Sequence, residues 1–462
     1  MARALQHADR EYLIWVLKRS RSIWTADQPA VWYLSTKSSE RGRSRFFTSV
    51  IQPLPWPESD DAVLIGRIQR YVGPPRLLHL AACGGHKGIV CELLHNGVDP
   101  NCILHDTTPL LLAAHAGHGD VVEVLLEGGA DLHFASPSGP TALYLAACCG
   151  HLQATVHLLA RGANANASIN AAGWTPLLCA IRNGREEVTV MLIEIGGDIK
   201  TALADGSTAL SLAAMSGHNT IATYLVFHGA EPNGVDKLQR WTPLHWAAHN
   251  GHDLMVWMLL RSGAALEATT SDGSTALLLA AQQGSADMVL GLLFKMGADF
   301  DCQTLDGATP LSIAAQYGAL DSVRFILDIG AGESGKSHIQ DWTPLHWAAN
   351  DGELNVVQYL VCEGGFQPDL APQNGTTALS LASEEGHINT VLFLLNSGAN
   401  PNAKSGLECW TPLHWAACNG HVSVVQLLRE RGADSGIRTA DGSTAADLAT
   451  EGGHCAAARL LL

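Results

Sequence analysis

The stretch that decides the fold is WTPLHWAAHNGHDLMVWMLLRSGA, residues 241–264. Threonine followed by proline is typical of a helix start, because the hydroxyl caps the first turn and the N–H that proline lacks would have no partner there. The residues LHWAA continue this helix, Gly251 ends it, and VWMLL fits a second helix. The stretch therefore predicts two short helices joined by a tight turn. One such pair cannot bury its own apolar side.

The same unit recurs along the chain. T-[PA]-L-x-x-A-A, followed by G-H and then V-x-x-L-L-x-x-G-A, begins in degenerate form at Arg76. It restarts 32 to 34 residues apart at Thr108, Thr141, Thr175, Thr208, Thr242, Thr275, Thr309, Thr343, Thr377, Thr411 and Thr444. Self-similarity at this period indicates a stack of helix pairs.

Pattern and period together closely resemble the ankyrin repeat, and WTPLHWAA occurs at 241–248, 342–349 and 410–417. The resemblance covers residues 76–462 and implies an all-α ankyrin-repeat solenoid of about twelve helix-turn-helix units with extended finger loops. Residues 1–75 are expected to form a separate N-terminal region, partly helical, with a flexible basic linker around STKSSERGRSR at 35–45. Long arrays of this style look like the C-terminal sensor regions of fungal multidomain signalling receptors.

The resemblance implies a protein–protein interaction function: a non-catalytic scaffold or adaptor, regulatory or accessory to a pathway. Fingers and first helices would form the inner groove that binds the partner. The candidate residues are the tryptophans before the capping threonine and the residue pairs before the helix-ending glycine: Trp174, Trp241, Trp342, Trp410, His249, Asn250, Gln316, Tyr317, Asn350 and Asp351.

Two interpretations of the finger tryptophans stay open. They could anchor a partner, since Trp is enriched in interface hot spots, or each could lie across a small neighbouring residue and stiffen the row of fingers. Trp246, Trp347 and Trp415, five residues further on, are expected to pack in the core.

The distribution of charged residues along the chain indicates which class of partner to expect. Residues 1–75 carry 11 Lys/Arg and 7 Asp/Glu, a net charge of +4, whereas the remaining residues carry 17 and 37, a net charge of −20. Such an acidic array repels phosphate backbones, so we expect partner proteins with basic patches rather than nucleic acid. No stretch approaches 18 uninterrupted apolar residues, and no membrane span is predicted.

The cysteines and histidines are candidates for disulfides, metal ligands and reactive groups. The 11 cysteines include no C-x-x-C pair, which predicts reduced thiols and a cytoplasmic, or alternatively nuclear, protein. Histidines recur in the T-P-L-H and G-H positions, where we expect hydrogen bonds to the backbone and neither a metal nor a cofactor. A regulatory thiol centred on Cys148-Cys149 is the alternative.

The segment GAGESGKS, residues 330–337, matches the phosphate-binding pattern G-x-x-x-x-G-K-[ST]. That chemistry needs a strand before the loop. In register with the other repeats, however, Gly330 and Ala331 fill the G-A position that ends a second helix, so a helix should precede them. A nucleotide-dependent switch at 330–337 is kept as the alternative function. With no G-x-S-x-G or H-E-x-x-H motif present, no enzyme is predicted.

Overall fold

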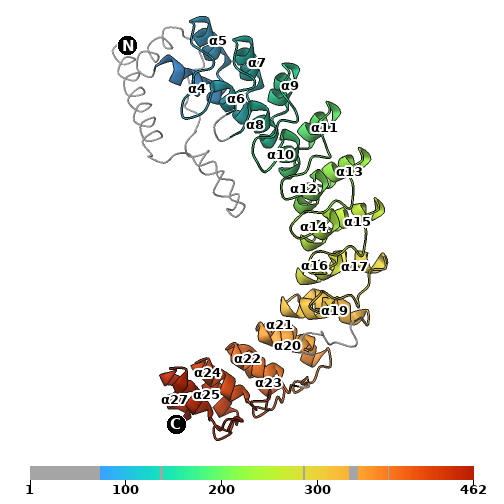
Figure 1. Ribbon diagram of the computed structural model, residues 1–462, viewed down its shortest axis with the longest axis vertical. Helices are drawn as coiled ribbons and strands as arrows, with labels where there is room; N and C mark the ends of the chain where they lie inside the picture. Colours follow the sequence, from blue (N-terminus) through green and yellow to red (C-terminus); the bar gives the residue numbers. More distant parts are fainter. Residues whose placement is uncertain (1–72, 136–138, 285–286, 332–341, 373) are drawn as a thin grey trace, which may run out of the picture. The chain divides into compact units, whose positions relative to one another are not determined.

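The computed structural model describes residues 73–135, 139–284, 287–331, 342–372 and 374–462. In these ranges the chain forms 24 α-helices and no β-strand, with only two isolated β-bridges. The predicted all-α repeat fold is therefore confirmed (Figure 1). The predicted N-terminal helices and linker before residue 73 lie outside the described residues.

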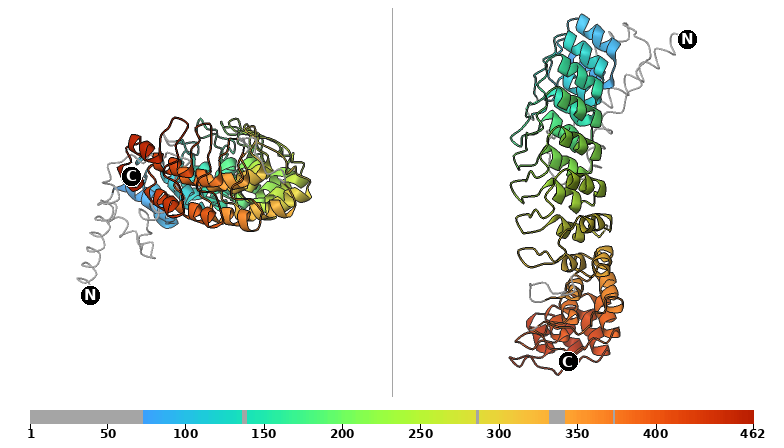
Figure 2. Two further views of the ribbon diagram at one scale, coloured as in Figure 1. Left: turned by 90° about the horizontal axis from the view of Figure 1, so that it is seen from below. Right: turned by 90° about the vertical axis from the view of Figure 1, so that its right-hand side faces the viewer.

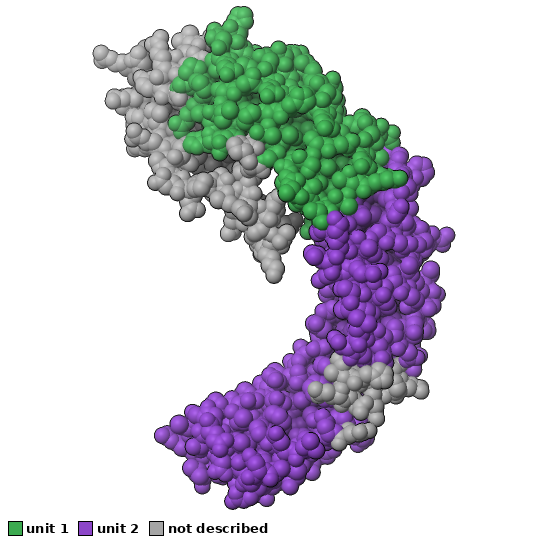
Figure 3. Space-filling view, in the orientation of Figure 1, with its two compact units in different colours: residues 1–204 green, residues 205–462 purple. Residues whose placement is uncertain are grey.

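The helices come in twelve successive pairs, divided between two compact units that meet in sequence at Ala204 and Asp205 (Figure 3). In unit 1, the first helices of the pairs are α4 (Pro74–Gly84), α6 (Pro109–Ala116), α8 (Ala142–Cys149) and α10 (Pro176–Arg182). The second helices are α5 (Lys87–His95), α7 (Gly119–Glu127), α9 (Leu152–Ala160) and α11 (Glu186–Glu194).

Unit 2 contains the other eight pairs. Its first helices are α12 (Ala209–Ser216), α14 (Pro243–His249), α16 (Ala276–Gln282), α18 (Pro310–Gln316), α20 (Pro344–Asn350), α22 (Ala378–Glu384), α24 (Pro412–Cys418) and α26 (Ala445–Glu451). Its second helices are α13 (Asn219–Phe227), α15 (Asp253–Arg261), α17 (Asp287–Lys295), α19 (Leu320–Asp328), α21 (Leu354–Cys362), α23 (Ile388–Asn396), α25 (Val422–Glu430) and α27 (Cys455–Leu461).

Within each unit, first helices pack on first helices and second helices on second helices, and the loops between repeats project from one edge (Figure 2). The core between the two layers comes from the repeated apolar positions. In the ninth pair, Leu345, Ala348 and Ala349 of α20 and Val356 and Leu360 of α21 are completely buried. The alanines allow neighbouring first helices to approach closely.

Every first helix except α4, whose N-cap is Gly73, begins after a threonine at the N-cap, as the sequence predicts. In α12, the Thr208 hydroxyl accepts from the N–H of Ser211 at 3.1 Å, and the Thr208 N–H donates to the Ser211 hydroxyl at 2.7 Å. In α14, histidine takes the place of serine, and the Thr242 N–H donates to Nδ1 of His245 at 3.0 Å. Both versions give the reciprocal capping box that fixes a helix start.

A glycine with positive φ follows each first helix, either at the C-cap or one residue beyond it. Gly117 follows α6 with φ of +84°, a conformation that side chains other than glycine rarely adopt. A Cβ added at Gly117 would also overlap the ring of His151 from the next repeat. The turn therefore needs glycine for two independent reasons.

The predicted role of the histidines, to tie neighbouring repeats together through the backbone, is confirmed at several positions. In the G-H position, His118 donates from Nε2 to the carbonyl of Cys83 at 3.0 Å, and His421 does the same to Glu384 at 2.8 Å. In the T-P-L-H position, His346 donates to the carbonyl of Thr376 in the next finger at 3.0 Å. Arg185 occupies a G-H position and donates to the carbonyl of Cys148 at 3.2 Å.

Asparagines in the fingers form a second set of links between repeats. The Asn166 side chain donates to the Gly196 carbonyl at 3.2 Å and accepts from the Asp198 N–H at 2.8 Å. Asn402 makes the same two bonds, to Gly432 and Asp434. Each asparagine thus satisfies one donor and one acceptor of the following repeat.

The surroundings of the GAGESGKS segment agree with the repeat register. Helix α19 ends at Asp328, and Gly330 follows with φ of +70°. The prediction that a helix, and not a strand, precedes this glycine is confirmed. Residues 332–341, including Lys336 and Ser337, lie outside the described residues.

Candidate functional site

Three finger tryptophans pack at a tilt against a tryptophan of the helix that follows. The ring centroids of Trp241 and Trp246 are 4.4 Å apart with an interplanar angle of 52°. The corresponding values are 4.8 Å and 61° for Trp342–Trp347, and 4.4 Å and 54° for Trp410–Trp415. All six side chains are half-buried. We call these three couples the indole pairs.

The indole pairs change the expected role of the helix tryptophans. Trp246, Trp347 and Trp415 were expected in the core, but all three retain exposed surface and none belongs to the buried core. They stand four residues after the capping threonine, where Leu212, Leu279 and Leu381 are buried in other repeats. Leu112, Leu145 and Ile313 are half-buried at the same position, which therefore lies at the edge of the core, and from there the indoles contact the finger tryptophans.

The first indole pair has a third ring beside it. His249, in the last turn of α14, lies 5.2 Å from Trp241 at an interplanar angle of 70°. Burial lowers the pKa of His249, which keeps the ring neutral at pH 7. Gln283 of the next repeat reaches Nδ1 of His249 at 3.5 Å. Trp241, Trp246 and His249 therefore form one continuous aromatic surface.

The other predicted site residues take different places. Asn250 is exposed, yet its carboxamide donates to the carbonyls of Trp246 at 2.9 Å and Met215 at 3.2 Å, so it also serves the frame. Asn350 donates to the exposed carboxylate of Asp351 at 2.8 Å. Gln316 is half-buried, while 55% of Tyr317 is exposed.

Trp174 differs from the other finger tryptophans. It is half-buried in unit 1, where its carbonyl accepts from the Ile169 N–H at 3.0 Å. The position four residues after its capping threonine holds Cys179 instead of tryptophan. The structure thus brings Trp241, Trp342 and Trp410 into indole pairs, but gives Trp174 no second indole at that position.

Charge is unevenly distributed over the first helices of unit 2. The sequences of α12, α14, α16, α18, α20, α22, α24 and α26 contain no Lys or Arg. Asp351, Glu384, Glu385 and Glu451 stand at or just beyond their ends. Burial, together with the neighbouring charge of Glu385, raises the pKa of Glu384. We call the surface formed by the indole pairs and the ends of these helices the first-helix face; it offers aromatic rings and carboxylates.

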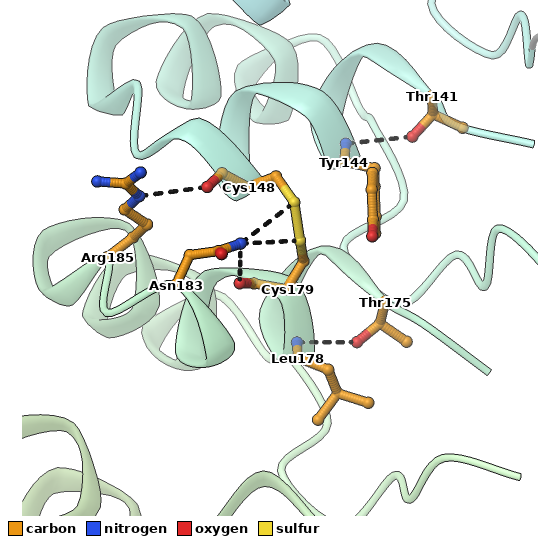
Figure 4. The surroundings of a disulfide bond; sticks show 8 residues. All are labelled: Thr141, Tyr144, Cys148, Thr175, Leu178, Cys179, Asn183 and Arg185. Carbon is orange, nitrogen blue, oxygen red and sulfur yellow. Dashed lines mark hydrogen bonds between the residues drawn. A yellow bond between two sulfur atoms is a disulfide. The ribbon is translucent and has the colours of Figure 1, made fainter. Parts of the chain in front are cut away.

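Two cysteines correct the expectation of reduced thiols throughout. Cys148 of α8 and Cys179 of α10 are joined by a disulfide, with Cα atoms 5.1 Å apart (Figure 4). The other nine cysteines are free, including Cys149, the neighbour that the sequence had singled out with Cys148. Cys148 stands seven residues after its capping threonine and Cys179 stands four after the next. The signal for this pair lies in the register between adjacent repeats and not in the cysteine content of either repeat.

Metal sites and membrane-spanning helices are two further features that the structure can contain. In the described ranges, no three His, Cys, Asp or Glu side chains are grouped so that they could hold a metal ion. No helix in the described part of the chain has the length and apolar character needed to cross a membrane.

Comparison with known proteins identifies the family of this repeat architecture. The family model for ankyrin repeats (3 copies) matches residues 78–169, 155–236, 191–270, 228–304, 244–337, 311–405 and 404–462. Similar curated proteins include the ankyrin repeat and KH domain-containing protein mask-1 of Caenorhabditis elegans, 34% identical over 205 residues. Another is the B-cell lymphoma 3 protein homolog of Mus musculus, 30% identical over 172 residues.

Each match covers only part of the two aligned proteins. The match with mask-1 covers 42% of this chain and 7% of mask-1, and the match with the B-cell lymphoma 3 protein homolog covers 36% of this chain and 38% of that protein. A solved structure, the human ASB11 ankyrin repeat domain, aligns with 47% of this chain and 96% of its own at 28% identity and a TM-score of 0.44. Because the family model recurs from residue 78 to residue 462, the chain belongs to the ankyrin repeat family.

Proposed function

We propose that the chain is a non-catalytic scaffold or adaptor that binds a partner protein through the first-helix face of unit 2. Ankyrin repeats are protein–protein interaction modules, and their recurrence along the chain supports a binding role. The observation that carries the proposal is the set of three indole pairs, half-exposed at the junction of finger and first helix.

The bonds that start α14 and link it to the next finger do not use the indole rings, whereas in the eleventh repeat Nε1 of Trp415 donates to the Ser405 hydroxyl at 3.1 Å. The capping bond in α14 runs between Thr242 and His245, and the bond to the next finger leaves from Nε2 of His245. Leucine fills the place of Trp246 in other repeats, where the same helix forms. Large, rigid rings held in place by a neighbouring ring lose little conformational entropy on binding, and Trp is enriched in interface hot spots.

Electrostatics supports a partner with basic patches. The first-helix face has carboxylates at Asp351, Glu384 and Glu385 and no cationic side chain on its helices. Glu384 and Glu385 repel each other, which is one cause of the raised pKa of Glu384. An approaching Lys or Arg would relieve this repulsion, and association should accordingly slow as salt is added.

A regulatory or accessory role in a pathway follows from a binding function without catalysis. We infer a cytoplasmic location, with the nucleus as a second possibility, and the nine free thiols support a reducing compartment.

Affinity capture with the intact protein tests the proposal. The test variant carries Trp241→Ala, Trp342→Ala and Trp410→Ala, and the matched control carries Trp257→Ala. Trp257 belongs to the second helix α15 and is 49% exposed, so its loss leaves the first-helix face intact. We expect a partner that binds the intact protein and the Trp257 variant but not the triple variant, at equal helicity by circular dichroism. Equal capture by all three proteins would contradict the proposal.

The alternative of a nucleotide-dependent switch receives no support from the described residues, because helix α19 stands where a phosphate loop has its strand. Calorimetry with ATP and GTP, with Lys336→Ala as the control, tests it directly. We expect no binding heat from either protein.

A further inference from the structure

The disulfide between Cys148 and Cys179 depends on a coincidence of register, not on cysteine content. The residue seven positions after one capping threonine is adjacent to the residue four positions after the next. Cys83 and Cys418 stand at the same position as Cys148, but their counterparts in the following repeat are Leu112 and Leu448. Both of these cysteines are free. Only repeats three and four place cysteine on both sides.

The two cysteine residues differ in burial. Cys148 is half-buried, while only 4% of Cys179 is exposed. Cys148 is therefore the side of the pair that an attacking thiol would approach. Cys149 is no competitor for the same reaction, because burial raises the pKa of its thiol and disfavours the reactive thiolate.

Hydrogen-bond donors surround the pair (Figure 4). The carboxamide nitrogen of Asn183 lies 3.3 Å from Sγ of Cys179, 3.4 Å from Sγ of Cys148 and 2.9 Å from the Cys179 carbonyl. In the sixth repeat, Asn250 makes the equivalent bond to the Trp246 carbonyl and a second bond to the Met215 carbonyl. The exposed guanidinium of Arg185 donates to the Cys148 carbonyl. The Asn183 carboxamide would stabilise a thiolate that forms on either sulfur.

We propose that Cys148 and Cys179 are a reversible thiol–disulfide pair, which links and releases helices α8 and α10 in exchange with a low-molecular-weight thiol such as glutathione. In reduction, a glutathione thiolate attacks Sγ of Cys148. The disulfide bond breaks, and its electron pair passes to Sγ of Cys179, which accepts hydrogen bonds from Asn183 and then takes a proton from water.

A second glutathione thiolate then attacks the glutathione sulfur of the mixed disulfide. It leaves as glutathione disulfide, and Cys148 departs as a thiolate that is protonated in turn. The protein pair gains two electrons and two protons, while two glutathione molecules are oxidised to one glutathione disulfide. Oxidation is the same sequence in reverse, with glutathione disulfide as the oxidant.

The redox state of the pair affects the position four residues after the capping threonine. Cys179 occupies the place that Trp246, Trp347 and Trp415 take in the indole pairs, and Trp174 is the finger tryptophan of the same repeat. Oxidation fixes this position by a covalent bond to α8, and reduction leaves it as a free side chain. The pair thus couples redox state to one repeat of unit 1.

Thiol trapping on the full chain tests the proposal. The purified protein is equilibrated in glutathione buffers of increasing ratio of reduced to oxidised form, quenched with acid, and alkylated in denaturant so that buried thiols also react, and each cysteine peptide is quantified by mass spectrometry. We expect alkylation of Cys148 and Cys179 to rise together and reversibly, while Cys149→Ser leaves the midpoint unchanged. Modification of both residues at every ratio, or of neither at any ratio, would refute the reversible pair.

Three variants test the mechanism. Cys179→Leu, which restores the leucine of neighbouring repeats, should leave Cys148 to accumulate a glutathione adduct. Cys148→Ser should leave the buried Cys179 without one. Asn183→Ala should slow reduction by about tenfold, the expected effect of losing one hydrogen bond to a charged group. An adduct on Cys179, or unchanged reduction of the Asn183 variant, would overturn the assigned roles. Circular dichroism checks that each variant is folded.

Discussion

His346 makes the stability of the array depend on pH in a way that can be calculated. Its ring is completely buried in α20, accepts at Nδ1 from the Thr343 N–H at 3.2 Å and donates from Nε2 to the Thr376 carbonyl at 3.0 Å. Burial lowers the pKa of His346 from 6.5 to about 4, against the opposing effect of the bond to Thr376. The perturbation is His346→Ser, because Ser380 provides the same capping box in the next repeat.

The magnitude follows from linkage. The native state resists protonation of His346 that the unfolded state accepts, so its contribution is complete above pH 6.5 and is lost as the pH falls towards 4. With one pKa unit equal to about 1.36 kcal/mol, the loss from this histidine between pH 7.5 and pH 5 is about 2 kcal/mol. Serine does not titrate. The cost of His346→Ser should therefore be about 2 kcal/mol smaller at pH 5 than at pH 7.5.

Urea unfolding followed by circular dichroism at both pH values measures this difference, fitted with the nearest-neighbour model that suits repeat arrays. Ser380→Ala is the matched control, since it removes the bond from the Thr377 N–H without removing a titratable group. Its cost should be the same at both pH values. A cost of His346→Ser that is also unchanged, within about 0.5 kcal/mol, would show that the buried histidine is not the source of pH dependence.

Three further predictions concern the frame. Gly117→Ala should lower the free energy of unfolding by about 1–2 kcal/mol from the positive φ alone, and more once the ring of His151 is displaced, as measured by urea unfolding. Asn402→Ala removes two inter-repeat hydrogen bonds and should cost about 1–3 kcal/mol in the same assay, whereas a neutral result would exclude the finger asparagines as links. Leu448→Cys should create a disulfide with Cys418 under oxidising glutathione, detected as the loss of two alkylated thiols; persistence of both thiols would contradict the register.

Much of the fold could be predicted because the sequence states it repeatedly. Thr208 and Thr242 begin equivalent helices in the structure, and Gly117 ends one with the expected positive φ. The period also decides what a local motif means. GAGESGKS resembles a phosphate loop by itself, but the register puts Gly330 behind a helix, and α19 is that helix.

The candidate site was harder to predict from the sequence, because it depends on contacts between side chains of different segments. Periodicity places Trp246 on a helix, but the same position is buried at Leu279 and half-buried at Leu145, so the pattern does not predict that an indole there contacts the finger tryptophan. The link between Cys148 and Cys179 needs the offset between adjacent repeats, which a search within each repeat does not examine. The hydrogen bonds of Asn402 in the finger also join two repeats, and a pattern of apolar residues does not predict them.

The register also explains how one frame can carry different chemistry. Stability comes from the caps, the buried alanines, the histidine links and the finger asparagines, and none of these stands at the position four residues after the capping threonine. The side chain at that position adds a polar bond in the eleventh repeat, where Trp415 donates to Ser405. That position holds Leu212 and Leu381 where it only packs, Trp246 where it meets a finger indole, and Cys179 where it meets the cysteine of the preceding repeat. Substitutions there should change binding or redox behaviour before they change the fold. Exchanging Trp246 for leucine is therefore expected to remove an anchor and leave the helix intact, because the chain itself already folds that helix around leucine.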